Sequence, residues 1–467
     1  MSFFISRPYL RGLSSVEKDG SPFFSIQTPT QSTTEPLLEG NMDIDNGYEK
    51  YLGFIEKNIR LKKGLSLDNV SYDLKISKGN LSDSENGKKP MREAIFKRFL
   101  DYYGIEFCFD RCLLDEVRRL LGNLMDAYIY KNRVKEAQVL EQFIQRQSIY
   151  EYSFGCLYVP LFTMMASRTK EPSSLSKIET RAYDEIDEYM PAFDNDETAL
   201  ILYLKAFQAR KRMAFDQSIQ YYAMALDSFN GRLWPQLEGI IKLNYAQSLT
   251  IASSYYDGYL SAKEAHDLFV KHGNYVRALM CYNNLANYLL CLQSFSAART
   301  CSEKALLSMG SFTGDSLYYR HAVTTMLIIL TLEGSFEQAI QFAKDHLVDW
   351  SDGFVGNLIL IPYCYYRLGQ KECCLKEMEK FDPDLLESDD KALFALLKAI
   401  LRENSAKIEA AKQKMLRICC RQKNWLMLMV LYQLLIDYYK SVNDLELLVD
   451  AYEGNNKVLR HQLPLSI

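Results

Sequence analysis

The chain has 467 residues, of which 48% are hydrophobic and only 12 are proline, so most of it is expected to fold, into two or more domains. The formal net charge of −4 excludes a protein that coats nucleic acid along its whole length, although it is compatible with a local basic surface. No run of eighteen apolar residues and no signal peptide is evident, so we expect a cytoplasmic protein with no membrane partner.

Residues 1–41 differ in composition from the rest of the chain. They are rich in Ser, Thr and Pro, carry few charges and show no helical period, as in "SIQTPTQSTTEP". This composition predicts either a flexible extension or a start site assigned too far upstream, and both interpretations stay open.

Residues 42–107 have the pattern of a small helical domain. A first helix is expected over 47–63 and ends at Gly64; Ser66 and Ser77 are placed to cap the next two helices, and Asn86–Gly87 ends the third. A fourth helix follows in "PMREAIFKRFLDYYGI". The expected core residues are Tyr51, Phe54 or Ile55, Ile59, Leu81, Phe96, Phe99, Leu100 and Tyr103.

The third of these helices carries residue types that bind nucleic acid. At the start of a helix in the major groove, Lys78 can bind guanine, Asn80 adenine and Asp83 cytosine, while Gly79 leaves room for close approach. Between Lys57 and Arg98 there are eleven basic and five acidic residues, against −4 for the whole chain. The alternative is a solvated helical hairpin whose charges only keep it soluble.

From about residue 110 a helical signature recurs. A large apolar residue is followed three positions later by a small one, and the last four copies are spaced by roughly 36 to 44 residues. Several copies have a second small residue seven positions on, such as Ala225 and Ala305. The copies are Val134 with Ala137, Phe215 with Ser218, Tyr259 with Ala262, Phe295 with Ala298, and Phe336 with Ala339. This period predicts a solenoid of eight or nine helical pairs, ending near residue 460.

A concave groove is expected along the first helices of these pairs. In "CYNNLANYLL", Asn283 and Asn287 lie one turn apart, and an asparagine amide both donates and accepts, so it can bind the backbone of an extended peptide. Arg210 could pair with a peptide carboxylate. Alternatively, these side chains stabilise helix contacts or face water.

Two parts of the chain resemble known families. "IRLKKGLSLDNVSYDLKISKGNLSDSENGKKP" is similar to the Cro/CI-type (XRE) helix-turn-helix, and the helical pairs, best at Tyr282 to Leu306, resemble tetratricopeptide (TPR) repeats. The order of the two resembles the RRNPP quorum-sensing regulators, the Rgg, PlcR, NprR and PrgX type. Leu67 stands where many such DNA-binding domains have Gln, and Ser84 where they bury a large apolar residue.

The resemblance implies an all-α protein, with a helix-turn-helix domain over 42–107 and a right-handed TPR-like α-solenoid over 108–467. It implies a transcription regulator that acts as a homodimer on a double-stranded DNA operator and is controlled by a short signalling peptide. The expected DNA-binding residues are Arg60, Ser66, Ser77, Lys78, Asn80, Ser82, Asp83, Lys88 and Lys89. The expected peptide-binding residues are Tyr203, Phe207, Arg210, Asn244, Gln247, Asn283, Asn287, His321 and Thr324.

Two other functions are compatible with this organisation. The array could be a scaffold that docks a protein partner, or the chain could be a phage-type peptide communication receptor. The Met/Leu-rich segment "WLMLMVLYQLL" is expected to be a capping helix or a dimer surface. We expect no enzyme, cofactor or metal site, because the sequence lacks H-E-x-x-H, phosphate-loop, dinucleotide-binding and G-x-S-x-G motifs, and its eleven cysteines include no C-x-x-C pair.

Overall fold

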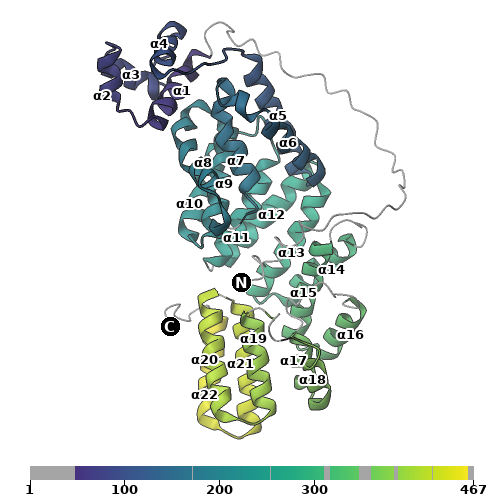
Figure 1. Ribbon diagram of the computed structural model, residues 1–467. Helices are drawn as coiled ribbons and strands as arrows, with labels where there is room; N and C mark the ends of the chain where they lie inside the picture. The colour runs from purple at the N-terminus through teal and green to yellow at the C-terminus, as the bar shows by residue number, and fades with distance from the viewer. Residues whose placement is uncertain are drawn as a thin grey trace. The chain divides into compact units, whose positions relative to one another are not determined.

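A computed structural model describes residues 48–170, 172–252, 254–309, 316–346, 359–382, 386, 388–422 and 424–460 (Figure 1). Within these ranges the regular elements are the helices α1 to α22 and short 3-10 turns, and a single β-bridge pairs Cys108 with Ser153. The expected all-α class is confirmed. The predicted extension over 1–41 lies outside the described residues.

Four helices form a small bundle, which we call the head: α1 (Glu49–Lys62), α2 (Leu67–Asp73), α3 (Lys78–Glu85) and α4 (Glu93–Tyr103). The apolar stripes predicted from the sequence form its core. Buried members include Tyr51, Phe54, Ile55, Leu81, Phe96, Phe99, Leu100 and Tyr103, whereas Ile59 is half-buried.

The crossing of α1 and α3 explains the small residue at position 84. An added Cβ at Gly53 would lie 2.0 Å from the carbonyl oxygen of Ser84, so the two backbones touch and no large side chain separates them. Ser84 is only half-buried there. It therefore does not replace a core side chain, and the head is packed around Phe54, whose ring end would lie 2.5 Å from a Cβ at Gly87.

The helices after the head form nine pairs in the described residues. Their bounds are α5 (Cys112–Ile129), α6 (Arg133–Tyr150), α7 (Val159–Ser167), α8 (Lys177–Tyr189), α9 (Asn195–Lys211), α10 (Phe215–Ser228), α11 (Leu237–Ile251), α12 (Tyr255–Lys271), α13 (Tyr275–Cys291), α14 (Phe295–Met309), α15 (Ser316–Leu332), α16 (Phe336–His346), α17 (Leu360–Arg367), α18 (Lys371–Met378), α19 (Ser388–Leu401), α20 (Ser405–Gln422), α21 (Trp425–Ser441) and α22 (Leu445–Leu459). The chain divides into two compact units between Leu237 and Glu238.

The small residues of the repeat signature lie where helices pack closely. Ser218, Ala225, Ala262, Ala298, Ala305 and Ala339 are all completely buried. Ser218 also donates its hydroxyl to the carbonyl oxygen of Ala206 at 2.9 Å, which ties α10 to α9. The first copy of the signature is an exception, since Val134 and Ala137 are exposed and α6 packs instead through Val139 and Phe143.

In seven of the nine pairs, the turn between the two helices shares one backbone feature. Each of seven turns contains a residue with φ between 51° and 81°, in the left-handed region: Lys131, Met213, Gln293, Gly334, Gly369, Glu403 and Asn443. Only two of the seven are glycine. Most of these turns therefore hold a side chain in a conformation that L-residues disfavour, and helix packing on both sides maintains it.

The Met/Leu-rich segment near the C-terminal end is buried. The segment "WLMLMVLYQLL" forms α21, and most of its side chains are buried between α19, α20 and α22, which lie side by side in Figure 1. It is an interior helix, so the prediction that it forms the end cap or a dimer surface is wrong. The last helix is α22.

Two further observations concern the whole of the described chain. Its eleven cysteines are unpaired, and six of them are buried. None of the helices in the described ranges is both long and apolar enough to span a membrane.

Candidate functional site

The N-terminal ends of α2 and α3 lie at the surface of the head. Ser66 caps α2 as predicted, with its hydroxyl oxygen accepting from the backbone N–H of Asn69 at 3.1 Å. Ser77 occupies the same position before α3, but its side chain makes no capping hydrogen bond. Figure 1 shows both helices on the side of the head that faces away from α8, with α1 between.

The side chains at the start of α3 are exposed. Lys78 pairs with Asp68 of α2, with 2.6 Å between Nζ and the carboxylate oxygen, and Lys89 reaches Asn80 at 3.3 Å and Asp83 at 3.2 Å. Exposed ion pairs of this kind contribute little, about 0–1 kcal/mol. A phosphate or base can therefore replace either partner at low cost.

Of three more predicted residues, Gly79 and Lys88 extend this surface and Ser82 does not. Gly79 is open, since an added Cβ would meet nothing closer than the Ser77 hydroxyl at 3.9 Å. Lys88 is exposed at the end of α3. Ser82 is half-buried, and its backbone carbonyl accepts from the Asn86 amide at 2.8 Å, so Ser82 belongs to the end of the helix rather than to its exposed start.

Arg60 does not lie on this surface. Its guanidinium is buried and binds both carboxylate oxygens of Glu85 at 2.7 Å, while its third contact is the carbonyl oxygen of Leu65 at 2.8 Å. These three hydrogen bonds hold the guanidinium inside the head. The prediction of Arg60 as a DNA-binding residue is therefore corrected: it is a core residue that joins α1 to α3.

A second carboxyl group lies beside this ion pair. Glu56 is fully buried and accepts from the Tyr103 hydroxyl at 2.6 Å, and its other oxygen has no hydrogen-bond partner among the described groups. Burial, and then the neighbouring carboxylate of Glu85, raises the pKa of Glu56 from 4.5 to about 9. Glu56 is therefore protonated at neutral pH.

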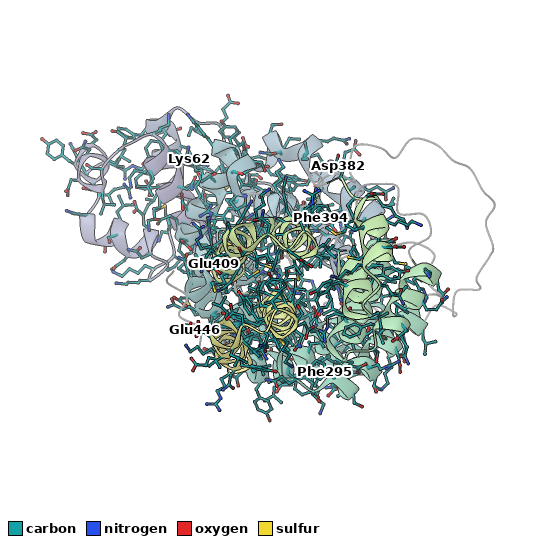
Figure 2. The ribbon with its side chains drawn as sticks, turned by 90° about the horizontal axis from the view of Figure 1, so that it is seen from below. Lys62, Phe295, Asp382, Phe394, Glu409 and Glu446 are labelled. Atoms are coloured by element: carbon teal, nitrogen blue, oxygen red, sulfur yellow. The ribbon has the colours of Figure 1, made fainter. Side chains whose placement is uncertain are left out.

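The head contacts the first helices of the array through α1. Lys57 pairs with Glu188 at 2.5 Å and Lys62, labelled in Figure 2, lies 3.8 Å from Glu185, both on α8. Arg111 lies over the ring of Tyr48, 3.7 Å from its centroid. Lys57 and Lys62 of the basic segment therefore form ion pairs with α8, and they are not part of the exposed face of α3.

A chain of hydrogen bonds continues from α1 into the array. Arg118 of α5 donates to the Tyr51 hydroxyl at 2.8 Å and to the Tyr158 hydroxyl at 2.9 Å, and Tyr158 donates to Glu197 at 2.8 Å. Glu197 belongs to the capping box of α9 with Asp194. Burial, and then repulsion from Asp194, raises the pKa of Glu197 above its usual value. Head and α9 are thus joined through Arg118, which is partly exposed, and the buried Tyr158 and Glu197.

The predicted peptide residues of α9 lie mainly inside the first unit. Tyr203 is buried and its hydroxyl is hydrogen-bonded to that of Tyr128. Arg210 is also largely buried and its guanidinium lies 4.9 Å from the centroid of the half-buried Phe207 ring. Tyr203 is therefore a packing residue, and the expectation that it lines an open groove is not met.

The remaining candidates lie on α11, α13 and α15. Asn244 donates to the carbonyl oxygen of Ile240 at 2.9 Å, and Asn287, which is largely buried, donates to that of Asn283 at 3.0 Å. These amides bond back to their own helix. Asn283 is half-buried, and its amide oxygen is buried without a hydrogen-bond partner in the described structure.

The other three positions vary in exposure. Gln247 and His321 are half-buried, whereas Thr324 is buried and donates to the carbonyl oxygen of His321 at 3.0 Å. Among the buried side-chain atoms of the predicted peptide set, the Asn283 amide oxygen is left without a hydrogen-bond partner in the described residues. No group of three or more His, Cys, Asp or Glu side chains is placed to hold a metal ion in the described ranges.

Sequence reasoning missed the partners of the predicted residues. Asp68, Glu85, Glu185, Glu188 and Arg118 each fix the position of a basic or aromatic side chain, as the contacts above show. The acidic run "DEIDEY" at 184–189 was the one sequence signal for a surface that receives lysines.

Comparison with solved structures shows that the helical array has a known fold. The crystal structure of a Rap protein complexed with Competence and Sporulation Factor superposes with a TM-score of 0.60 at 13% identity, covering 75% of this chain and 100% of that one. The apo form of the quorum sensor NprR from B. thuringiensis gives 0.58 at 13% identity over 74% and 99%. NprR in complex with its cognate peptide NprX gives 0.51 at 14% identity over 71% and 98%.

These identities establish a shared helical-repeat fold and nothing finer. No protein-family model matches the sequence, and no curated protein matches it either.

Proposed function

We propose that this chain is a sequence-specific DNA-binding transcription regulator of the RRNPP type, in which the head is a helix-turn-helix domain and the array is a peptide sensor. The observation that carries the DNA-binding part is the exposed, uncovered start of α3, where Ser77, Lys78, Gly79 and Asn80 all face solvent. The proposal includes no catalytic step, cofactor or metal.

The chemistry of this surface suits a DNA duplex. Lys78 would bind guanine O6 and N7, and Asn80 would bind adenine N6 and N7, while Asp83 would accept from cytosine N4. The N-terminal ends of α2 and α3, with Ser66 and Ser77, would bind phosphates, as would Lys88 and Lys89. Arg60 is left out of this set because Glu85 holds its guanidinium inside the head.

Fluorescence anisotropy with duplexes from the region upstream of this protein's own gene tests DNA binding. We expect one duplex to bind in a salt-sensitive, saturable way, and Lys78→Ala with Asn80→Ala to weaken its binding by at least tenfold, since a good bidentate base contact is worth about 1–3 kcal/mol. Lys263→Ala, an exposed lysine of α12, is the control and should bind as the wild type does. The DNA-binding proposal fails if no upstream duplex binds.

The peptide-sensing part rests on the array. NprR, which shares the fold, has been solved with its cognate peptide NprX. In the part of the chain that the structure describes, the amide oxygen of Asn283 is buried and meets no hydrogen-bond donor, and such a group costs about 1–3 kcal/mol unless a ligand or water binds it. A backbone N–H of an extended peptide is a suitable donor.

A mixture of random short peptides, incubated with the full-length protein and recovered by gel filtration, tests this part. We expect a restricted set of peptides to be retained and their affinity to fall about fivefold or more in Asn283→Ala. Asn195→Ala, at the exposed start of α9, is the matched control. Retention of no peptide, or of peptides unaffected by Asn283→Ala, contradicts the proposed site; retention of a folded protein partner alone favours a docking scaffold.

A further inference from the structure

The last helix, α22, has two apolar faces. One face holds Ala451, Gly454 and Val458, which are buried against α21. The contact is close, because an added Cβ at Gly454 would lie 2.1 Å from Cε1 of Tyr432. The position of α22 on the unit is therefore fixed, and so is the direction of its other face.

The opposite face carries an exposed apolar stripe. Leu445 is 66% exposed, Val449 56% and Tyr452 46%. They are spaced by four and three residues, and the same spacing continues to Asn456 and Leu459. This is the a/d repeat of a coiled coil, with Asn456 at an a position, where a polar residue specifies register and partner number.

Among the described helices, α22 packs mainly against α21, and three large side chains of its other face are left exposed. A row of large apolar side chains on the outward face of α22 is the pattern of a helix that pairs with another helix.

The charges around the stripe indicate what that second helix is. Glu446, Asp450 and Glu453 lie toward the N-terminal end of α22, whereas Lys457 and Arg460 lie at its C-terminal end, and all five are exposed. Figure 2 labels Glu446 at the start of this helix. Two copies of α22 in antiparallel orientation place the acidic half of each beside the basic end of the other, whereas a parallel pair aligns like charges.

We propose that α22 pairs in an antiparallel manner with α22 of a second copy of this chain, through the seam of Leu445, Val449, Tyr452 and Asn456. The same surface patch is used by both subunits, as in a two-fold interface. The inference rests on the proposed function for its biological purpose, a dimer on two DNA half-sites, and it names the surface that forms this dimer.

Sedimentation velocity of the full-length protein over a range of concentrations tests the seam. We expect the wild type to be a dimer and Leu445→Glu with Val449→Glu to be a monomer at the same concentrations. Val134→Glu, which also replaces an exposed aliphatic residue (69% exposed) but on α6, should remain dimeric. Circular dichroism melting of each variant checks that it is folded. A monomeric wild type, or a dimeric seam variant, overturns the proposal.

Charge exchange tests the orientation. Glu446→Arg alone should weaken the dimer by roughly two- to fivefold per ion pair, and adding Arg460→Glu should restore it. If the double variant is weaker than the single one, the helices are not antiparallel. The anisotropy assay with upstream duplexes separates the two proposals. A dimer that depends on the seam but binds no duplex supports the seam and overturns the proposed function. A monomeric wild type that binds a duplex supports DNA binding and overturns the seam.

Discussion

Glu56 is a titratable group enclosed in the head, and it makes head stability depend on pH. Because its folded pKa is raised from 4.5 to about 9, its stabilising contribution is complete below pH 4.5 and is lost as the pH rises through about 9. We expect head stability to fall by up to about 1.4 kcal/mol per pH unit inside this window. Glu56→Gln, which cannot ionise, should remove most of this dependence.

Urea titrations of the full-length protein at several pH values measure the pH dependence of head stability. At each urea concentration, a pulse of hydrogen exchange at one fixed pH reports whether α1 and α4 are unfolded. Glu106→Gln, an exposed carboxyl group after α4, should keep the wild-type slope. Equal pH dependence in the wild type and Glu56→Gln would show that Glu56 is not the group that titrates.

For single residues, the sequence predicts which side chains are exposed better than it predicts which groups they contact. Ser66, Lys78 and Asn80 follow from helix starts and lie where expected. Arg60 could not be placed in the same way, because its partner Glu85 is 25 residues away and a buried arginine has the same sequence appearance as a basic surface residue. Only the three-dimensional crossing of α1 and α3 shows which of the two it is.

Helix α22 depends on the absence of a side chain at Gly454. Gly454→Ala would place a Cβ 2.1 Å from the Tyr432 ring, so we expect a loss of about 1–3 kcal/mol from overpacking, despite the better helix propensity of alanine. Gly122→Ala is the matched control inside α5, where an added Cβ meets nothing within 4 Å. This substitution should stabilise the protein by up to about 1 kcal/mol. Calorimetry of both variants measures the difference; equal shifts in melting temperature would contradict the close contact.

Arg118 joins α1 of the head to Tyr158 beside α9. Arg118→Met keeps much of the side-chain volume but removes both hydrogen bonds, so we expect the head to remain folded while its attachment weakens by about 1–3 kcal/mol. Limited proteolysis in the segment 104–111 should become severalfold faster. Arg133→Met, an exposed arginine at the start of α6, serves as the control. Unchanged cleavage would mean that apolar packing alone holds the head.

The helices and their small packing residues were largely predictable from periodicity, whereas the faces they use were not. Ser218 and Ala298 are buried as the signature requires, but Val134 and Ala137 have the same spacing and are exposed. Spacing identifies a stripe without saying whether a neighbour covers it. The same limit explains the C-terminal end, where the most apolar segment proved to be interior and the less apolar α22 is outermost.

For the whole molecule, the sequence indicated a basic segment near the start of a chain of net charge −4, and the change of pattern at about residue 110 follows the end of α4 at Tyr103. The division between Leu237 and Glu238 was not predictable. Each repeat contacts mainly its neighbours, so a solenoid can separate into compact units inside a run of similar repeats without any linker in the sequence.

The segregation of charge predicts how affinity for DNA responds to salt. Eleven basic and five acidic residues lie between Lys57 and Arg98 in a chain of net charge −4, so phosphate contacts should be confined to the head. The logarithm of affinity should fall linearly with the logarithm of salt concentration, by about 0.9 for each phosphate contact.

Lys88→Gln with Lys89→Gln should lower this slope by roughly two and weaken the binding of all duplexes equally, because these lysines would contact phosphates rather than bases. Anisotropy titrations at several salt concentrations measure it, with Lys263→Gln and Lys271→Gln on α12 as the charge-matched control. A slope unchanged by the head substitutions, or lowered equally by the control, would place the DNA contacts outside the exposed face of α3, since Lys57 and Lys62 are engaged by Glu188 and Glu185.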